Sequence, residues 1–197
     1  MLVKNKRAII ILHTMKIPTD NPTIINNHRN ILQSSLLETP LGTMLAIANA
    51  QALYMLEFVD QCDLERTIEQ LKIKTKSAII PGRTCHIDSI EQELALYFAG
   101  RLKEFKTPVH LTGSSFQHNV WNSLLTIPYG TTISYAQEAR IIGKPSAHRA
   151  VANANGANQL IIIIPCHRII QSNGSLGGYG AGIARKQWLL DHEKKNI

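Results

Sequence analysis

A thiol, an imidazole and a guanidinium stand directly behind the most apolar segment of the chain. Residues 160–164 read Leu-Ile-Ile-Ile-Ile, and Pro165, Cys166, His167 and Arg168 follow them. The β-branched run predicts a buried strand that ends at Pro165, because proline has no N–H to donate to a ladder. Burying reactive polar groups in such a segment is costly unless each has a partner. This segment is therefore the first candidate for a functional site.

Cys166 is a candidate nucleophile, because a thiolate can be stabilised by a neighbouring base or cation. Adjacent side chains of an extended segment point to opposite faces, so a direct hydrogen bond from Cys166 to His167 is awkward and a relay through one bound water is more natural. Glu193 is our candidate to orient the imidazole, since a carboxylate at a helix C-terminus needs a partner. The alternative is that Cys166 is inert packing, as cysteines in apolar segments usually are.

The composition is that of a globular protein with a polyanionic partner. Hydrophobic residues make up 44% of the chain and charged residues 18%, which argues against disorder. The formal net charge is +7, and residues 113–197 alone carry +5, whereas residues 31–112 carry −2. We therefore expect nucleic acid to contact the C-terminal part. The simpler alternative is that the basic residues only keep the protein soluble.

The cysteines exclude a disulfide framework, since there are only three of them, at positions 62, 85 and 166. This usage predicts a reducing, intracellular compartment. No stretch approaches membrane-spanning length, so no membrane partner is expected. Cys85 and His86 form half of a metal site at most, and no second ligand pair lies at zinc-site spacing. We therefore expect no metal and a structural role for this pair.

The first half of the chain predicts a small α+β domain at residues 31–108, preceded by a loosely ordered extension at residues 1–30. Its expected elements are a β-like stretch over 31–59 with a hairpin of residues 44–48 and 52–59, a helix from Asp63, as N-cap, to Lys72, and a second helix over 88–102. Residues 107–115 read as a linker. None of these elements carries residues that indicate chemistry.

The second half, residues 113–197, predicts a mainly helical domain. Ser114 and Ser134 each begin a capping box, with Gln117 and Gln137 three residues later. The second box opens a short helix that ends at Gly143, and another short helix follows over 147–155, which together outline a helix-turn-helix. The latter helix is rich in alanine, so its face can approach a partner closely, and Arg149 is the long charged side chain near its start. A final helix is expected over 183–192.

The sequence Pro165-Cys166-His167-Arg168 resembles the active-site signature of the O6-alkylguanine-DNA alkyltransferases. The similarity covers essentially all of residues 113–197. It includes, in the order and spacing of that family, Phe116-Gln117, Val120-Trp121, Ile127-Pro128-Tyr129-Gly130, Ser134-Tyr135, Arg149-Ala150-Val151, Asn155-Gly156-Ala157-Asn158, Gly178-Tyr179 and Lys186 to Glu193. Residues 39–42 and 97–100 resemble the N-terminal domain of the bacterial members more weakly.

The resemblance implies an α+β protein with a small ribonuclease H-like α/β domain and a helical domain that holds the helix-turn-helix and the active-site cysteine. The implied activity is that of a methylated-DNA–protein-cysteine S-methyltransferase. Cys166 would irreversibly take a methyl or other alkyl group from O6-alkylguanine, or from O4-alkylthymine, after the base is flipped out of double-stranded DNA. No cofactor is implied, and each protein would act once. A monomer in the cytoplasm is expected, at the nucleoid in a bacterium or in the nucleus of a eukaryote.

The resemblance also assigns roles to individual residues. His167, through a water and backed by Glu193, would take the thiol proton. Tyr135 would donate a hydrogen bond to the guanine ring and help to rotate the phosphate of the target nucleotide. Lys186 would support the same network. Arg149 would fill the gap left by the flipped base. Further DNA contacts would come from Ser146, Ala147 and Ala150 in the minor groove, and the base pocket would be formed by Val151, Asn158, Tyr179, Gly180 and Ala181.

Three positions depart from the family pattern. Glu138 takes a usually apolar place, Gln159 replaces a common proline, and Ala181 stands where several relatives have glycine.

Two other functions compete with repair. A non-catalytic lesion sensor of the same fold would lack the cysteine, so Cys166 argues against it. A cysteine hydrolase would need an oxyanion hole and multiple turnovers, and the Cys–His geometry expected here is poor for it.

Overall fold

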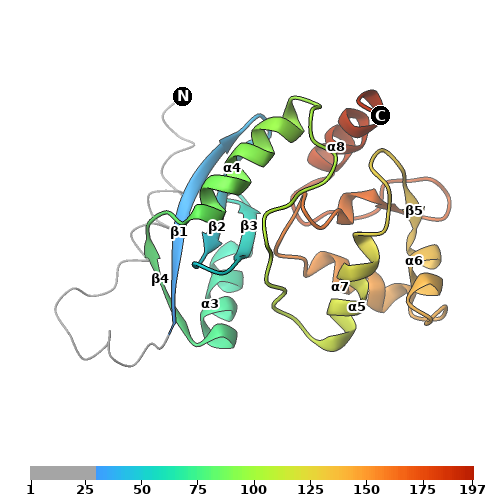
Figure 1. Cartoon of the computed structure of the whole chain (residues 1–197). Coiled ribbons are helices and arrows are strands. Elements are labelled where there is room, and N and C mark those ends of the chain that lie inside the picture. Colours follow the sequence, from blue (N-terminus) through green and yellow to red (C-terminus); the bar gives the residue numbers. More distant parts are fainter. Residues whose placement is uncertain (1–29) are drawn as a thin grey trace. The chain divides into compact units, whose positions relative to one another are not determined.

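The computed structural model describes residues 30–197, which form two compact units (Figure 1). One unit comprises the described residues up to Leu94 together with Lys106–Thr112, and the other comprises Ala95–Phe105 and Gly113–Ile197. The extension predicted at residues 1–30 lies, apart from Asn30, outside the described residues. The domain limits predicted at 31–108 and 113–197 stay a prediction.

The first unit contains a four-stranded sheet in the order β3-β2-β1-β4. Its strands are β1 (Asn30–Thr39), β2 (Gly42–Ala48), β3 (Leu53–Phe58) and β4 (Ser77–Pro81). Strands β1, β2 and β3 are antiparallel neighbours, and β4 lies parallel to β1. The predicted hairpin is thereby confirmed as β2 and β3. Strand β4 was not predicted, because its five residues contain one proline and little alternation.

Two helices accompany the sheet, α3 (Leu64–Thr75) and α4 (Cys85–Phe98). Helix α3 packs its buried face, which includes Ile68, against Leu45 and Ile47 of β2 in one hydrophobic cluster. Asp63 stands at the N-cap, as predicted, although its side chain makes no capping hydrogen bond. Helix α4 begins three residues earlier than predicted, which places Cys85 in its first turn. Within the described residues no cluster could hold a metal ion.

The second unit is mainly helical, as predicted. Its elements are α5 (Ser115–Leu124), β5 (Ile133–Ser134), α6 (Tyr135–Ile141), α7 (His148–Gly156), the 3-10 turn η1 (Cys166–Arg168), β6 (Ile169–Ile170) and α8 (Ile183–Lys195). Both predicted capping boxes are present. Helices α6 and α7 pack on each other and on α5, and β5 pairs with β6. Taken together, the elements give the predicted α+β class. No helix of the described part is both long and apolar enough to cross a membrane.

The isoleucine run is buried but does not form the predicted strand. Ile164 N donates to Leu160 O at 2.9 Å, so the run closes into a tight turn. Ile162 lies in the left-handed region with φ of 73°, which a β-branched residue rarely adopts. The reason is Asn158, whose amide donates to Ile164 O at 2.8 Å and accepts from Leu160 N at 3.0 Å. The side chain supplies the partners that a neighbouring strand would otherwise provide.

Candidate active site

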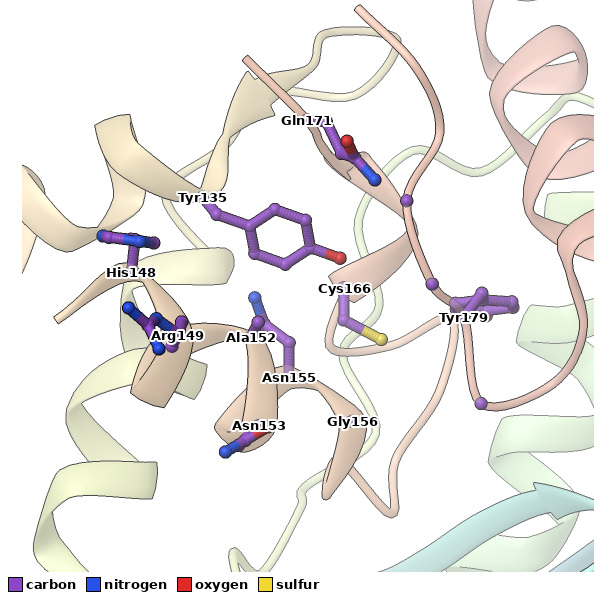
Figure 2. Close-up of a pocket in the computed structure, with 13 residues that line it drawn as sticks. Tyr135, His148, Arg149, Ala152, Asn153, Asn155, Gly156, Cys166, Gln171 and Tyr179 are labelled. Carbon is purple, nitrogen blue, oxygen red and sulfur yellow. The ribbon is translucent and has the colours of Figure 1, made fainter. Parts of the chain in front are cut away.

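Cys166 borders a cavity of about 400 Å³ in the second unit (Figure 2). The thiol is at the start of η1, directly after the tight turn. Residues from α6, α7 and the segment 171–180 complete the wall, and Figure 2 shows the Tyr135 ring pointing toward Cys166. The cavity is lined by Tyr135, His148, Arg149, Ala152, Asn153, Asn155, Gly156, Cys166, Gln171, Gly177, Gly178, Tyr179 and Gly180.

Asn158 holds Cys166 in place. Its Nδ2 lies 3.2 Å from Cys166 Sγ, and the same side chain braces the turn that ends at Ile164. Asn158 is only 4% exposed and Cys166 only 7%. A donor aimed at the sulfur favours the thiolate over the thiol. Asn158 therefore braces the turn and also contacts the sulfur directly, and the sequence did not indicate this second contact.

His167 follows the cysteine in η1, which is a 3-10 turn and not the extended segment that was expected, and its side chain does not line the cavity that Cys166 borders. Its Nε2 is 2.8 Å from Glu193 Oε1, and both side chains are fully buried. Since an ionised carboxylate only accepts hydrogen bonds, Nε2 carries the proton and Nδ1 holds the lone pair. Nδ1 is buried and makes no hydrogen bond within the described residues. Burial lowers the pKa of His167, although Glu193 opposes that shift. The imidazole is therefore neutral and able to accept a proton.

Glu193 is held by more donors than the sequence suggested. Arg168 donates from Nε to Oε2 at 2.9 Å and from Nη2 to Oε1 at 3.0 Å. The Tyr97 hydroxyl donates to Oε1 at 2.9 Å, and Gly130 N donates to Oε2 at 3.0 Å. Burial alone would raise the pKa of Glu193, but the hydrogen bonds from His167 and Arg168 and the charge of Arg168 hold it well below its usual value. Glu193 is thus a permanently ionised anchor.

Of these donors to Glu193, Arg168 could have been predicted from the sequence, whereas Tyr97 and Gly130 could not. A buried arginine needs a carboxylate partner, and Glu193 was already the candidate. Tyr97 lies 96 residues away in the sequence, so no local pattern connects it to Glu193. Gly130 has φ of 74°, and a Cβ there would approach Ile197 Cγ1 to 2.6 Å. The main chain at this position reaches the carboxylate only because the residue is glycine.

Lys186 is buried behind the cavity. Its Nζ donates to the carbonyl of Ile169 and, at 3.2 Å, to that of Gly178, and lies 6.0 Å from the centre of the Tyr135 ring. Burial lowers the pKa of Lys186 to about 8, while Cys166 acts in the opposite direction. Burial and the nearby Cys166 raise the pKa of the Tyr135 hydroxyl. The hydroxyl is therefore a donor at neutral pH, as the predicted role requires.

The residues predicted to contact DNA gather at the start of α7. Arg149 is exposed and lines the cavity together with Tyr135 and Cys166. Ser146 and Ala150 are exposed and Ala147 is half-buried, but none of the three lines the cavity.

The residues predicted to form the base pocket separate into two groups. Tyr179 and Gly180 line the cavity, whereas Val151, Asn158 and Ala181 are buried and do not line it. Sequence reasoning missed Gln171 and Asn155, which do line it. Asn155 belongs to a motif already singled out, so its place in the Asn-Gly-Ala-Asn run was an available signal.

The second unit thus combines a buried thiol, a buried histidine–carboxylate pair and a helix-turn-helix, an arrangement suited to a cysteine nucleophile that acts on DNA. Two family models match the chain. Residues 32–111 match "6-O-methylguanine DNA methyltransferase, ribonuclease-like domain", and residues 115–195 match "6-O-methylguanine DNA methyltransferase, DNA binding domain". The match therefore extends over both units.

Curated relatives and solved structures agree with the family models. A methylated-DNA–protein-cysteine methyltransferase of Mycobacterium leprae is 40% identical over 161 residues, which are 82% of this chain and 92% of that protein. One from Methanosarcina barkeri is 37% identical over 82% of this chain and 97% of its own. The crystal structure of the Mycobacterium tuberculosis O6-methylguanine methyltransferase matches with a TM-score of 0.71 and 39% identity, covering 84% of this chain and 94% of that one. The chain belongs to the 6-O-methylguanine DNA methyltransferase family.

Proposed function

We propose that this protein repairs alkylated DNA by transferring the alkyl group of O6-alkylguanine to Cys166. The observation that carries the proposal is the position of Cys166 in the wall of the cavity, with a donor on its sulfur from Asn158 and a buried His167–Glu193 pair beside it. The chain is a methylated-DNA–protein-cysteine methyltransferase by family. The solved M. tuberculosis relative in complex with DNA, 38% identical with a TM-score of 0.71, supports double-stranded DNA as the partner.

The reaction is a direct displacement. The thiol proton of Cys166 passes through a water to Nδ1 of His167, and Glu193 stabilises the resulting imidazolium. The thiolate attacks the alkyl carbon, so that a carbon–sulfur bond forms while the carbon–O6 bond breaks. The electron pair returns to the purine, which takes up at N1, through solvent, the proton that His167 received from the thiol, and the base remains in the DNA as guanine. Because the thioether is not hydrolysed, each molecule reacts once.

Access to the lesion requires the base to leave the stack, since O6 lies within the duplex. In this proposal the start of α7 enters the minor groove with Ser146, Ala147 and Ala150 against the backbone, and Arg149 fills the space left by the base. Tyr135 donates to the ring from one side of the cavity, and Tyr179 and Gly180 bound the other. Lys186 supports Tyr135 from beneath. The cavity is shaped further by three buried residues that do not line it, Val151, Asn158 and Ala181.

The test is intact-protein and peptide mass spectrometry after incubation with a duplex that contains O6-methylguanine. We expect one added methyl group per protein, on the peptide that contains Cys166, with saturation at one equivalent. Cys166→Ala should abolish the transfer and retain binding to the duplex. Methyl transfer by Cys166→Ala would contradict the assignment of the nucleophile.

Two other functions predict different outcomes of the same experiment. A lesion sensor would bind the duplex and remain unmodified, although its site would have no use for the Cys166 thiol. A cysteine hydrolase would release product repeatedly from an ester substrate without a stable mass change.

We further propose that the protein acts as a monomer at the DNA of the cell, in the cytoplasm or nucleoid of a bacterium or the nucleus of a eukaryote. We also propose that it accepts O4-alkylthymine.

A further inference from the structure

Glu138 is a buried carboxyl group that the proposed reaction does not use. It lies on α6, one turn after Tyr135, and is 0% exposed. Asn155 of α7 donates from Nδ2 to its Oε2 at 2.7 Å, and Ser123 of α5 lies 3.3 Å from its Oε1. Among the described residues Glu138 forms no ion pair. The carboxyl therefore joins three helices and has no charged partner.

The hydrogen bonds around Glu138 are complete only when the carboxyl is protonated. Ser123 has one hydroxyl proton, and its Oγ lies 2.7 Å from Val120 O but 3.3 Å from Glu138 Oε1. If that proton bonds to Val120 O, the shorter contact, Oε1 of an ionised Glu138 has no donor. A neutral Glu138 donates from Oε1 to Ser123 Oγ and accepts from Asn155 at Oε2. In agreement, burial raises the pKa of Glu138 to about 7, against the hydrogen bonds of Asn155 and Ser123.

The partner Asn155 connects this carboxyl to the reactive centre. Asn155 lines the cavity at the end of α7 (Figure 2), and Trp121 of α5 fixes the same end by donating to Ala154 O at 2.8 Å. Three residues further on, Asn158 contacts Cys166 Sγ. Glu138 itself belongs to α6, and the first residue of that helix, Tyr135, also lines the cavity. A change at Glu138 therefore acts on both sides of the cavity.

We propose that Glu138, as a neutral acid, is a positioning residue that joins the Tyr135 helix to the end of α7 and keeps the cavity competent for transfer. The inference rests on the proposed function. Ionisation of Glu138 places an uncompensated charge among α5, α6 and α7 and removes the hydrogen bond that the neutral acid donates to Ser123. The competent fraction of the protein then falls as the pH rises.

If Glu138 ionises, the described groups around it do not compensate its negative charge. Its contacts from α5 and α7 are the uncharged Ser123 and Asn155. On its own helix, Tyr135 is the titratable group whose pKa it influences, and Arg140 lines a separate cavity beside residues 170–174. On α7, Arg149 lines the active-site cavity. None of these side chains forms an ion pair with Glu138.

The test compares the rate of methyl transfer from duplex O6-methylguanine for the wild-type protein and Glu138→Gln as a function of pH. Glutamine can donate from its amide to Ser123 and accept from Asn155 at any pH. We expect equal rates near pH 6 and an advantage of about tenfold for the variant near pH 8, because each pH unit above a pKa near 7 lowers the neutral fraction tenfold. Titration of Cys166 affects both proteins alike and cancels in the ratio.

Exposed Glu65, on α3, provides the matched control. Glu65→Gln removes the same charge and should follow the wild-type profile. A ratio for Glu138→Gln that stays constant from pH 6 to 8.5 would overturn the inference. Wild-type protein that transfers no methyl group at any pH would instead refute the proposed function, so the two failures differ.

A second measurement on the wild-type chain needs no folded variant. The carboxyl carbon of Glu138 should titrate near pH 7 in ¹³C NMR spectra, and a midpoint below pH 5 would overturn the inference. The pH dependence of the protein's stability should have the sign that a raised pKa of Glu138 implies. A pKa of about 7 in the folded state against 4.5 when unfolded means that stability is fully present below pH 4.5 and is lost as the pH rises through 7. The melting temperature of Glu138→Gln should therefore exceed that of the wild type at pH 8.5.

Discussion

At the scale of single residues, the site is organised by hydrogen bonds that fix one protonation state for each group. Glu193 accepts from His167, Arg168, Tyr97 and Gly130 and stays ionised. His167 is thereby restricted to one tautomer, with its lone pair on Nδ1. In the proposed transfer His167 acts as a base only once, so a rigid and permanently oriented His167–Glu193 pair suits a protein that reacts a single time.

Tyr97→Phe tests this view of Glu193. The variant loses one hydrogen bond to a buried carboxylate, so the free energy of unfolding should fall by about 2 kcal/mol. Since His167 and Arg168 still hold Glu193, the transfer rate should fall by less than about tenfold. Chemical denaturation and single-turnover kinetics measure the two quantities.

Tyr54→Phe is the matched control for Tyr97→Phe. Tyr54 accepts one neutral hydrogen bond from Asn49 in the first unit, and its loss should cost about 1 kcal/mol or less and leave the transfer rate unchanged. Equal stability of Tyr97→Phe and the wild type would mean that the hydroxyl does not contribute to holding Glu193.

At the scale of elements, local side-chain hydrogen bonds decide where helices begin and where the chain turns. The two capping boxes start α5 and α6 as their sequence predicts. The same kind of interaction overrides the strand pattern of residues 160–164, because Asn158 bonds to the main chain at both ends of the run. The turn delivers Cys166 to the cavity at the cost of a strained backbone at Ile162.

Substitution by glycine should reveal that strain. Ile162 and Ile161 are both buried, at 1% and 3% exposure, but only Ile162 has a positive φ. Ile161→Gly loses its packing without compensation, whereas Ile162→Gly also relieves about 1–2 kcal/mol of left-handed strain. Thermal unfolding should therefore show the smaller loss of stability for Ile162→Gly. A larger loss at Ile162 would mean that the packing of its side chain outweighs any relief of strain.

At the scale of the whole molecule, charge is unevenly distributed along the chain. Residues 113–197 carry a net charge of +5, whereas residues 31–112 carry −2. The positive part coincides with the helix-turn-helix and the cavity. Affinity for the duplex should accordingly come from counterion release at the second unit, while the chemistry at Cys166 is insensitive to salt.

Arg149→Ala separates binding from chemistry. The plot of log affinity for duplex DNA against log salt should lose about one unit of slope, because one cationic contact disappears. Repair of the duplex should slow, whereas reaction with free O6-alkylguanine base should not change, since the free base needs no extrusion.

Lys74→Ala is the matched control for Arg149→Ala, because it removes one exposed charge from α3 in the first unit. It should leave both reactions and the salt slope unchanged. Equal losses on duplex and free base for Arg149→Ala would contradict a role in base extrusion.

The sequence by itself determined the elements that depend on neighbouring residues, and it singled out the groups for which reactive roles are proposed. Capping boxes, the hairpin and the amphipathic helices are local patterns, and Cys166, His167 and Glu193 were recognisable from their types and places. The tertiary structure alone decided which distant groups meet. Tyr97 reaches Glu193, Glu138 reaches Asn155 and Ser123, and Asn158 reaches the sulfur of Cys166. A buried polar group takes whichever partner folding brings within about 3 Å, and that distance is not encoded by spacing along the chain.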